Sequence, residues 1–113
     1  MRLRKNTDNS NDKDVELIAN VSDALAHPAR VQIFQYIMEQ NSTGTEVCNR
    51  DVFLHFDYAQ ATVSQHIKKL IDSGLIQVSK QGKNSYYFGN AGLLMKYVDT
   101  TKKFTIEILK DRR

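Results

Sequence analysis

The sequence is poor in the residues that cross-link, break or turn a chain. Its 113 residues include one cysteine, one proline and five glycines. A single cysteine excludes an internal disulfide, so packing must stabilise the fold, and so few glycines and prolines argue against a turn-rich all-β architecture. No hydrophobic run is long enough to cross a membrane, and residues 1–14 lack the apolar core of a signal peptide. We therefore expect a cytoplasmic protein with one small domain.

Positive charge is in excess, and the excess is confined to one segment. The net formal charge of the chain is +3. Residues 58–88 contain four lysines and one aspartate, whereas the rest of the chain carries equal numbers of acidic and basic residues. A concentrated basic stretch is typical of a surface that binds nucleic acid, although solvated lysines on an ordinary surface would give the same pattern.

Hydrophobic periodicity predicts helices through most of the chain. Residues 1–12 lack such a period and are expected to form a flexible N-terminal tail, which leaves residues 13–113 as the single domain. Pro28 suits the first turn of one helix, and Thr45 followed by Glu46 suits the start of another. The predicted helices cover residues 13–26, 28–40, 46–56 and 60–72, and a last helix follows Gly89.

The hydrophobic pattern changes between the fourth and fifth predicted helices. The stretch LIQVSKQGKNSYYFG, residues 75–89, has strand-like runs on both sides of QGKN. Two such runs around a short polar connection predict a β-hairpin. The predicted fold is therefore mainly α with a small β-hairpin, in the order α-α-α-α-β-β-α.

The fourth predicted helix, QATVSQHIKKLID, has one apolar face and one hydrogen-bonding face. Val63, Ile67 and Leu70 recur at helical spacing and should face the core, and Gln65 lies almost opposite them. A helix joined to this one by a short corner makes a helix-turn-helix, and the basic hairpin makes the unit winged. Because the DNA major groove admits one α-helix, the polar face is expected to contact DNA. The predicted DNA-binding residues are Gln60, Thr62, Ser64, Gln65, His66, Lys68 and Lys69 of the helix and Lys80 and Lys83 of the hairpin.

Three segments, ALAHPARVQIFQYI, QATVSQHIKKLIDSGLI and KQGKNSYYF, together resemble the ArsR-type winged-helix repressors of bacteria. The resemblance covers residues 15–105 in the same order, with one departure: Ala59 stands where the family usually has a Ser or Thr. It implies a homodimeric repressor that binds a palindromic DNA operator until an inducer arrives, and the sequence does not name that inducer. It also implies that the first and last helices form the dimer interface. The residues expected there are Val15, Ile18, Leu25, Tyr97, Val98, Phe104 and Ile108.

Many relatives in that family sense metals, but this sequence departs from their metal-binding patterns. EVCNRDV resembles the thiolate-binding box of one branch, yet it offers Cys48 alone, with Arg50 in the place of the second cysteine. A thiophilic metal needs several thiolates. At the positions of the last helix where another branch uses Asp and His, this chain has Ala91, Leu93, Lys103 and Ile106, and Glu107 is the only possible ligand there. We therefore expect no metal site, no cofactor and no metal response.

Nothing in the sequence indicates catalysis. Cys48 and a histidine lack a third orienting group at a recognisable spacing, so the chain is not expected to be an enzyme, and Cys48 is interpreted as a small buried residue. His27 is expected to cap the helix that follows it, whereas His66 is interpreted either as a phosphate contact or as a packing or solvated residue. The alternative function is a winged-helix protein-interaction module without sequence-specific DNA binding.

Overall fold

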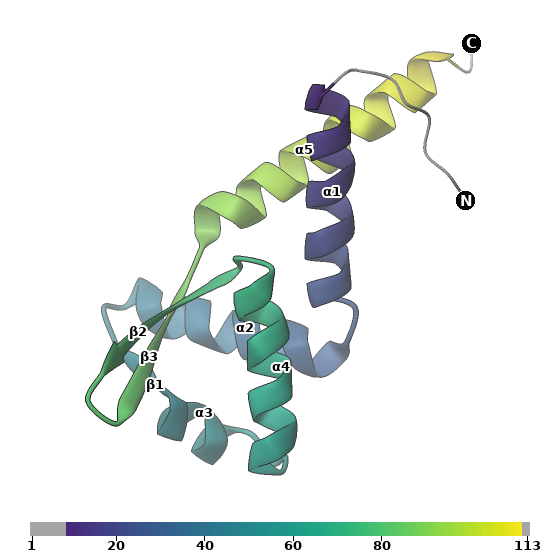
Figure 1. Ribbon diagram of the computed structural model, residues 1–113. Coiled ribbons are helices and arrows are strands. Elements are labelled where there is room, and N and C mark those ends of the chain that lie inside the picture. The colour runs from purple at the N-terminus through teal and green to yellow at the C-terminus, as the bar shows by residue number, and fades with distance from the viewer. Residues whose placement is uncertain (1–8, 112–113) are drawn as a thin grey trace.

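The computed structural model describes the backbone of residues 9–111 and the side chains of residues 12–110. Within that range the fold is mainly helical with one small antiparallel sheet, which confirms the predicted fold class (Figure 1). No helix in this range combines the length and hydrophobicity needed to span a bilayer. The elements in chain order are α1 (Asn9–Ala24), α2 (Pro28–Ser42), β1 (Val47–Cys48), α3 (Asn49–His55), α4 (Gln60–Asp72), β2 (Ile76–Gln81), β3 (Asn84–Gly89) and α5 (Ala91–Asp111).

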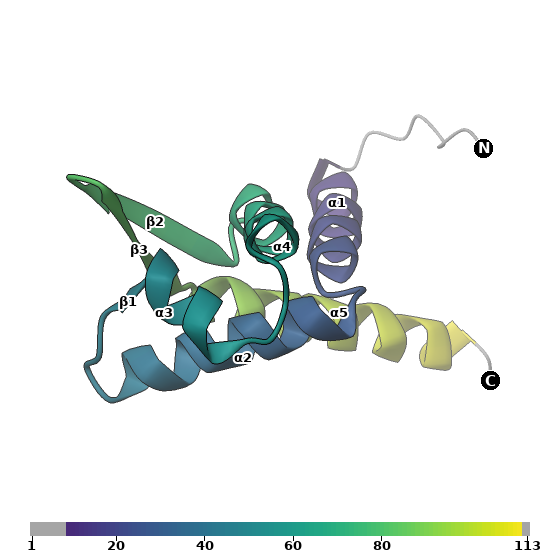
Figure 2. The same ribbon diagram turned by 90° about the horizontal axis from the view of Figure 1, so that it is seen from below.

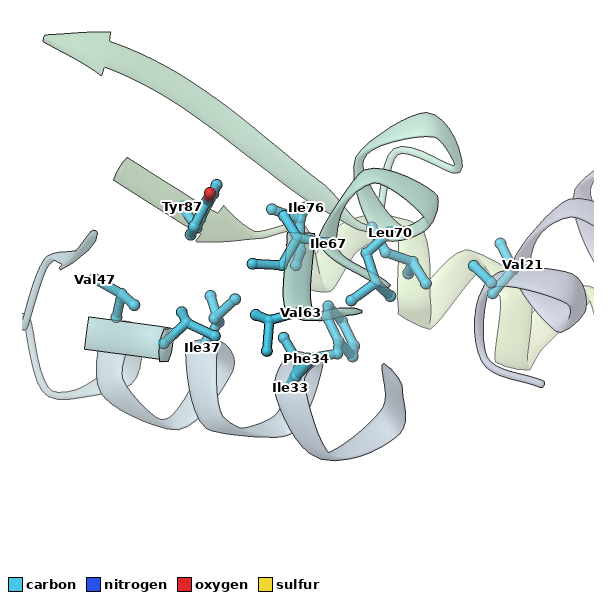
Figure 3. Close-up of a cluster of buried hydrophobic side chains, with 13 residues drawn as sticks. Val21, Ile33, Phe34, Ile37, Val47, Val63, Ile67, Leu70, Ile76 and Tyr87 are labelled. Carbon is cyan, nitrogen blue, oxygen red and sulfur yellow. The ribbon is translucent and has the colours of Figure 1, made fainter. Parts of the chain in front are cut away.

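The core lies where α2 and α4 meet the sheet. Ile33 and Ile37 of α2 are fully buried, as are Val63 and Leu70 of α4, and Figure 3 shows these side chains turned toward one another. Each such side chain contributes about 1.5–3 kcal/mol when it leaves water. The apolar stripe of α4 is therefore fixed against α2, and the opposite face of α4 must lie outside.

The sheet contains a strand that the sequence analysis missed. Its order is β1-β3-β2, and β1 pairs antiparallel with β3 so that Val47 faces Tyr87. Residues 47–48 were expected to begin a helix capped by Thr45, and that prediction is wrong. Helix α3 begins at Asn49, and the carboxylate of Asp51 accepts a hydrogen bond from the backbone N–H of Cys48, with an N···O distance of 2.9 Å. Burial of Val47 against the core favours the strand over an extra helical turn.

The ends of α1 also differ from the prediction. Helix α1 begins at Asn9, so residues 9–12 are helical rather than part of a tail, and Asp12 lies in the first turn, where a carboxylate favours the positive end of the helix dipole. Residues 1–8 of the expected tail lie outside the described residues. The helix stops at Ala24 rather than residue 26. The Ala24 carbonyl cannot accept from residue 28, which is proline, and it accepts instead from Nε of Arg30, with an N···O distance of 2.7 Å.

Helix α5 crosses α1 and continues beyond the rest of the molecule (Figures 1 and 2). Where the two helices meet, the hydroxyl groups of Ser22 and Tyr97 are hydrogen-bonded at 2.9 Å. Further along, the ammonium group of Lys103 lies 3.1 Å from the carboxylate of Asp14. These contacts orient α5, yet most of its C-terminal half has exposed side chains.

Candidate nucleic-acid interface

Helix α4 presents a continuous polar face to solvent. Val63, Ile67 and Leu70 are buried beneath it, and the predicted contact residues occupy the opposite side. His66 is half-buried. The other predicted residues of this helix are exposed, namely Gln60, Thr62, Ser64, Gln65, Lys68 and Lys69. The structure thus brings the predicted helix residues onto one surface of hydrogen-bond donors, acceptors and positive charge.

The two ends of α4 are built differently. At the start, Ala59 is the N-cap residue and supplies no side-chain hydrogen bond, as the sequence indicated. A Ser or Thr there would stabilise the helix by about 1 kcal/mol. At the end, the chain turns at Gly74, whose φ of 89° lies in the left-handed region that favours glycine. The buried stripe of Val63, Ile67 and Leu70 therefore holds the helix without help from a capping side chain.

One lysine of this face has a partner on the same helix. The Lys68 ammonium lies 3.1 Å from the Asp72 carboxylate one turn later. Both side chains are largely exposed, so this pair contributes at most about 1 kcal/mol to stability. An approaching anion can therefore compete for Lys68 at little cost.

The hairpin lies beside α4 as a wing. Strands β2 and β3 are joined at Gly82, whose φ is 65°, and Lys80 and Lys83 are exposed on it as predicted. Tyr87 on β3 is buried and anchors the hairpin to the core. Between the wing and α4 lies a groove of about 230 Å³, lined by residues of both elements that include Ser64, Lys68, Lys80 and Ser85. Predicted residues from the two elements therefore share one surface.

On its other side, α4 faces the corner between α1 and α2, and here the structure adds residues that the sequence analysis did not connect. His27 is the N-cap of α2, as expected: its Nδ1 accepts a hydrogen bond from the backbone N–H of Ala29 at 3.1 Å. The His27 ring lies 4.6 Å from the ring of His66, centroid to centroid, and Nη1 of Arg30 lies 3.4 Å from Nδ1 of His66. Burial, and then the nearby charges of His27 and Arg30, lower the pKa of His66 below its ordinary value.

Arg30 was not among the predicted site residues. It lies in the segment ALAHPARVQIFQYI, which served to place the start of a helix and to support the family resemblance but not to predict a DNA contact. It is separated from His66 by 36 positions, so only the packing of α2 against α4 reveals their proximity. The one signal available in the sequence was that Arg30 is a basic residue in the first turn of α2.

The expected dimer residues fall into two groups. Ile18, Leu25 and Tyr97 are partly buried, and the latter two pack against the core of their own chain. The other predicted residues lie exposed on α1 and α5, namely Val15, Val98, Phe104 and Ile108. The same two helices line a mainly apolar hollow of about 260 Å³ that includes Val15 and Phe104. The exposed group is therefore an apolar surface without a partner in the described part of the chain.

Cys48 and His55 lie away from the polar face of α4. Cys48 is half-buried at the start of α3, and the ring of His55 stacks on Tyr36 with centroids 4.0 Å apart. Among the described residues, no three His, Cys, Asp or Glu side chains are grouped closely enough to hold a metal ion.

Part of the sequence also matches a known family of regulatory proteins and two of its curated relatives. The family described as "Bacterial regulatory protein, arsR family" matches residues 27–78, from the N-cap of α2 into β2. An arsenical resistance operon repressor of Staphylococcus xylosus is 31% identical over 70 residues, which are 62% of this chain and 62% of that protein. The family match covers 52 of the 113 residues, a little under half of the chain. A second arsenical resistance operon repressor, from Staphylococcus aureus, is 37% identical over 49 residues, 43% of this chain and 47% of that protein. The match thus spans less than two thirds of the length of either curated relative.

Solved structures share the fold of this chain. An ArsR-like transcriptional regulator from Rhodococcus sp. RHA1 superimposes with a TM-score of 0.74 at 18% identity, covering 86% of this chain and 87% of that one. The homodimeric winged helix-turn-helix DNA-binding domain of a possible ArsR-family regulator from Mycobacterium bovis gives a TM-score of 0.67 at 17% identity, covering 98% and 93%. At these identities the likeness establishes the fold alone.

Proposed function

We propose that this chain is a transcriptional repressor that binds double-stranded DNA as a homodimer. The observation that carries the proposal is the exposed polar face of α4, which is backed by a buried apolar stripe and lies between a basic wing and a second basic flank. A helix of this kind fits the major groove, where Gln pairs with adenine and Thr contacts the thymine methyl group. Lysines at its edges and on the wing suit backbone phosphates.

The proposed operator is an imperfect palindrome. Two-fold symmetry of a homodimer places two α4 helices in successive major grooves, so half-site centres lie about one helical turn apart, about 34–36 Å. Gln60 to Lys69 would read each half-site, and Lys80 and Lys83 would contact the backbone beside it. The name of the Staphylococcus relatives supports repression as the mode of action.

The first test is the salt dependence of DNA binding. Lys83 lies exposed near the tip of the wing. If it contacts a phosphate, Lys83→Ala should weaken binding to all duplexes alike and flatten the slope of log K against log salt by about one unit. Lys96→Ala, which removes an exposed lysine from α5, is the matched control and should leave the slope unchanged. Binding that is weak and insensitive to salt in the wild type would instead favour a protein-interaction module.

We propose further that repression by this chain does not respond to metal ions. Cys48 is the only cysteine in the sequence, and in the described region it has no grouped His, Cys, Asp or Glu partners. Arsenite, zinc or cadmium at stoichiometric amounts should therefore leave the duplex Kd unchanged, whereas regulatory coupling would shift it by about 5–150-fold. Fluorescence anisotropy of a labelled duplex measures this directly, and metal-induced release of DNA would refute this part of the proposal.

A further inference from the structure

A hollow of about 360 Å³ lies between α4 and the start of α2. Figures 1 and 2 both place α4 between the wing on one side and α1 on the other, so this hollow flanks the polar face opposite the wing. We call it the Arg30 pocket. Its lining residues are Arg30, Gln65, His66, Lys68, Lys69 and Asp72.

The charge of the Arg30 pocket favours an anion. Three cationic side chains line it against one carboxylate, that of Asp72, which is already paired with Lys68. Among the described residues, Lys69 forms no salt bridge. The pocket therefore retains two uncompensated positive charges, those of Arg30 and Lys69, on a DNA-facing flank of the molecule.

Arg30 is held in place before any ligand arrives. Its Nε donates to the Ala24 carbonyl at 2.7 Å, and its Nη2 donates to the Asp23 carbonyl at 3.2 Å. Both acceptors lie at the C-terminal end of α1, so they fix the plane of the guanidinium group. Its Nη1 is directed toward Nδ1 of His66. A guanidinium fixed in this way loses little conformational entropy when it binds a phosphate.

The hydrogen bond between Arg30 and His66 requires neutral His66. Arginine can only donate, so Nδ1 of His66 must carry a lone pair rather than a proton. A phosphate oxygen that entered the pocket would replace this acceptor for Arg30. Nδ1 of His66 would then be available to take a proton from solvent and donate it to the same phosphate.

We propose that the Arg30 pocket binds one DNA backbone phosphate in each half-site, and that His66 takes up a proton as the phosphate binds. This inference rests on the proposed DNA-binding function and adds to it a phosphate site distinct from the wing. Arg30 supplies a fixed cation, Lys69 a second one, and His66 a donor that becomes charged in the complex.

The groups around His66 determine the sign of the pH dependence. His27 comes from the turn before α2 and Arg30 from α2, while Lys68, Lys69 and Asp72 share α4 with His66. In the free protein, burial, His27 and Arg30 lower the pKa of His66. A bound phosphate adds negative charge beside the ring and raises this pKa, so the complex holds more protons than the free protein and DNA affinity increases as pH falls.

The stability of the free protein should change in the opposite direction. Because His66 has a lower pKa folded than unfolded, the unfolded chain binds the proton more readily. The contribution of His66 to folding is therefore present above the unfolded pKa and is lost as pH falls through that value toward the lower folded one. A pH-dependent DNA affinity that merely followed protein stability would weaken in acid, whereas the proposed site strengthens binding.

The test compares the wild type with His66→Gln, which keeps a polar side chain at a half-exposed position and removes the titration. With a duplex enriched from a random pool by the wild-type protein, the wild-type Kd should tighten between about pH 7.5 and about pH 5.5. The limit is about tenfold per pH unit for each His66, or about a hundredfold for the two His66 side chains of a dimer. His66→Gln should lose this dependence. His27→Asn, which keeps a capping side chain, and His55→Gln on α3 should each retain most of it.

A second measurement locates the phosphate. Duplexes in which single phosphates are replaced by neutral methylphosphonates should reveal one backbone position per half-site where the wild type loses more affinity than His66→Gln, which retains only the contacts of Arg30 and Lys69. If His66→Gln keeps both the wild-type pH dependence and the wild-type methylphosphonate profile, the pocket does not hold a phosphate, although the chain binds DNA. If the folded wild type binds no duplex, the proposed function itself fails.

Discussion

Phe104→Glu should convert the proposed homodimer into a folded monomer at micromolar concentration. Phe104 is 55% exposed on α5, and Val98, Ile108 and Val15 are exposed to a similar degree on the same pair of helices. Their own chain leaves these side chains uncovered, because α5 extends beyond the body of the molecule (Figure 1), and a second copy of the chain would bury them. A central interface residue of this kind costs about 2 kcal/mol or more when it is lost, and a buried unpaired carboxylate adds to that cost.

The expected effect is a weakening of the dimer by at least about thirtyfold. Sedimentation velocity measures it, and circular dichroism checks that the helices remain. Leu54→Glu is the matched control, because Leu54 on α3 is even more exposed, at 74%, but lies away from α1 and α5. It should leave the dimer intact. A wild type that sediments as a monomer, or a Phe104→Glu variant that still dimerises, would contradict this interface.

The sequence was sufficient to predict the elements that carry a long regular pattern. In α4 the repeat of Val63, Ile67 and Leu70 determined which face is buried, and therefore which side chains are exposed. The hairpin was predicted from its alternation and its turn, which the structure places at Gly82. Helix α4 and the hairpin could be predicted from one sequence because each pattern involves residues that are close together along the chain.

Features that depend on distant parts of the chain were missed. Strand β1 has two residues, too few to show a period of two, and its partner Tyr87 lies 40 positions beyond Val47. The proximity of Arg30 and His66 likewise depends on how α2 packs on α4. The lysines and the glutamine of the polar face were correctly predicted to be exposed, because that prediction requires only knowing which face of one helix is buried. To predict a pocket, one must know how several elements pack against one another.

If the exposed face of α4 reads DNA sequence, a substitution of Gln65 should show it most directly. Its side chain is exposed on the side opposite the buried stripe. If it pairs with a base edge, Gln65→Ala should lose about 1–3 kcal/mol on the preferred duplex and relax preference at one base pair per half-site. Binding to a scrambled duplex should hardly change, because phosphate contacts supply that affinity. Gln35→Ala, an exposed glutamine on α2, is the matched control.

The decisive measurement is the ratio of Kd values for a scrambled duplex and for the duplex that the wild type enriches, determined at one salt concentration for the wild type and for Gln65→Ala. We expect the ratio to fall in Gln65→Ala by about 5–150-fold for each half-site, the fold-change that corresponds to the free energy of one lost base contact. An unchanged ratio in a folded, dimeric Gln65→Ala protein would show that α4 does not read DNA sequence through this face.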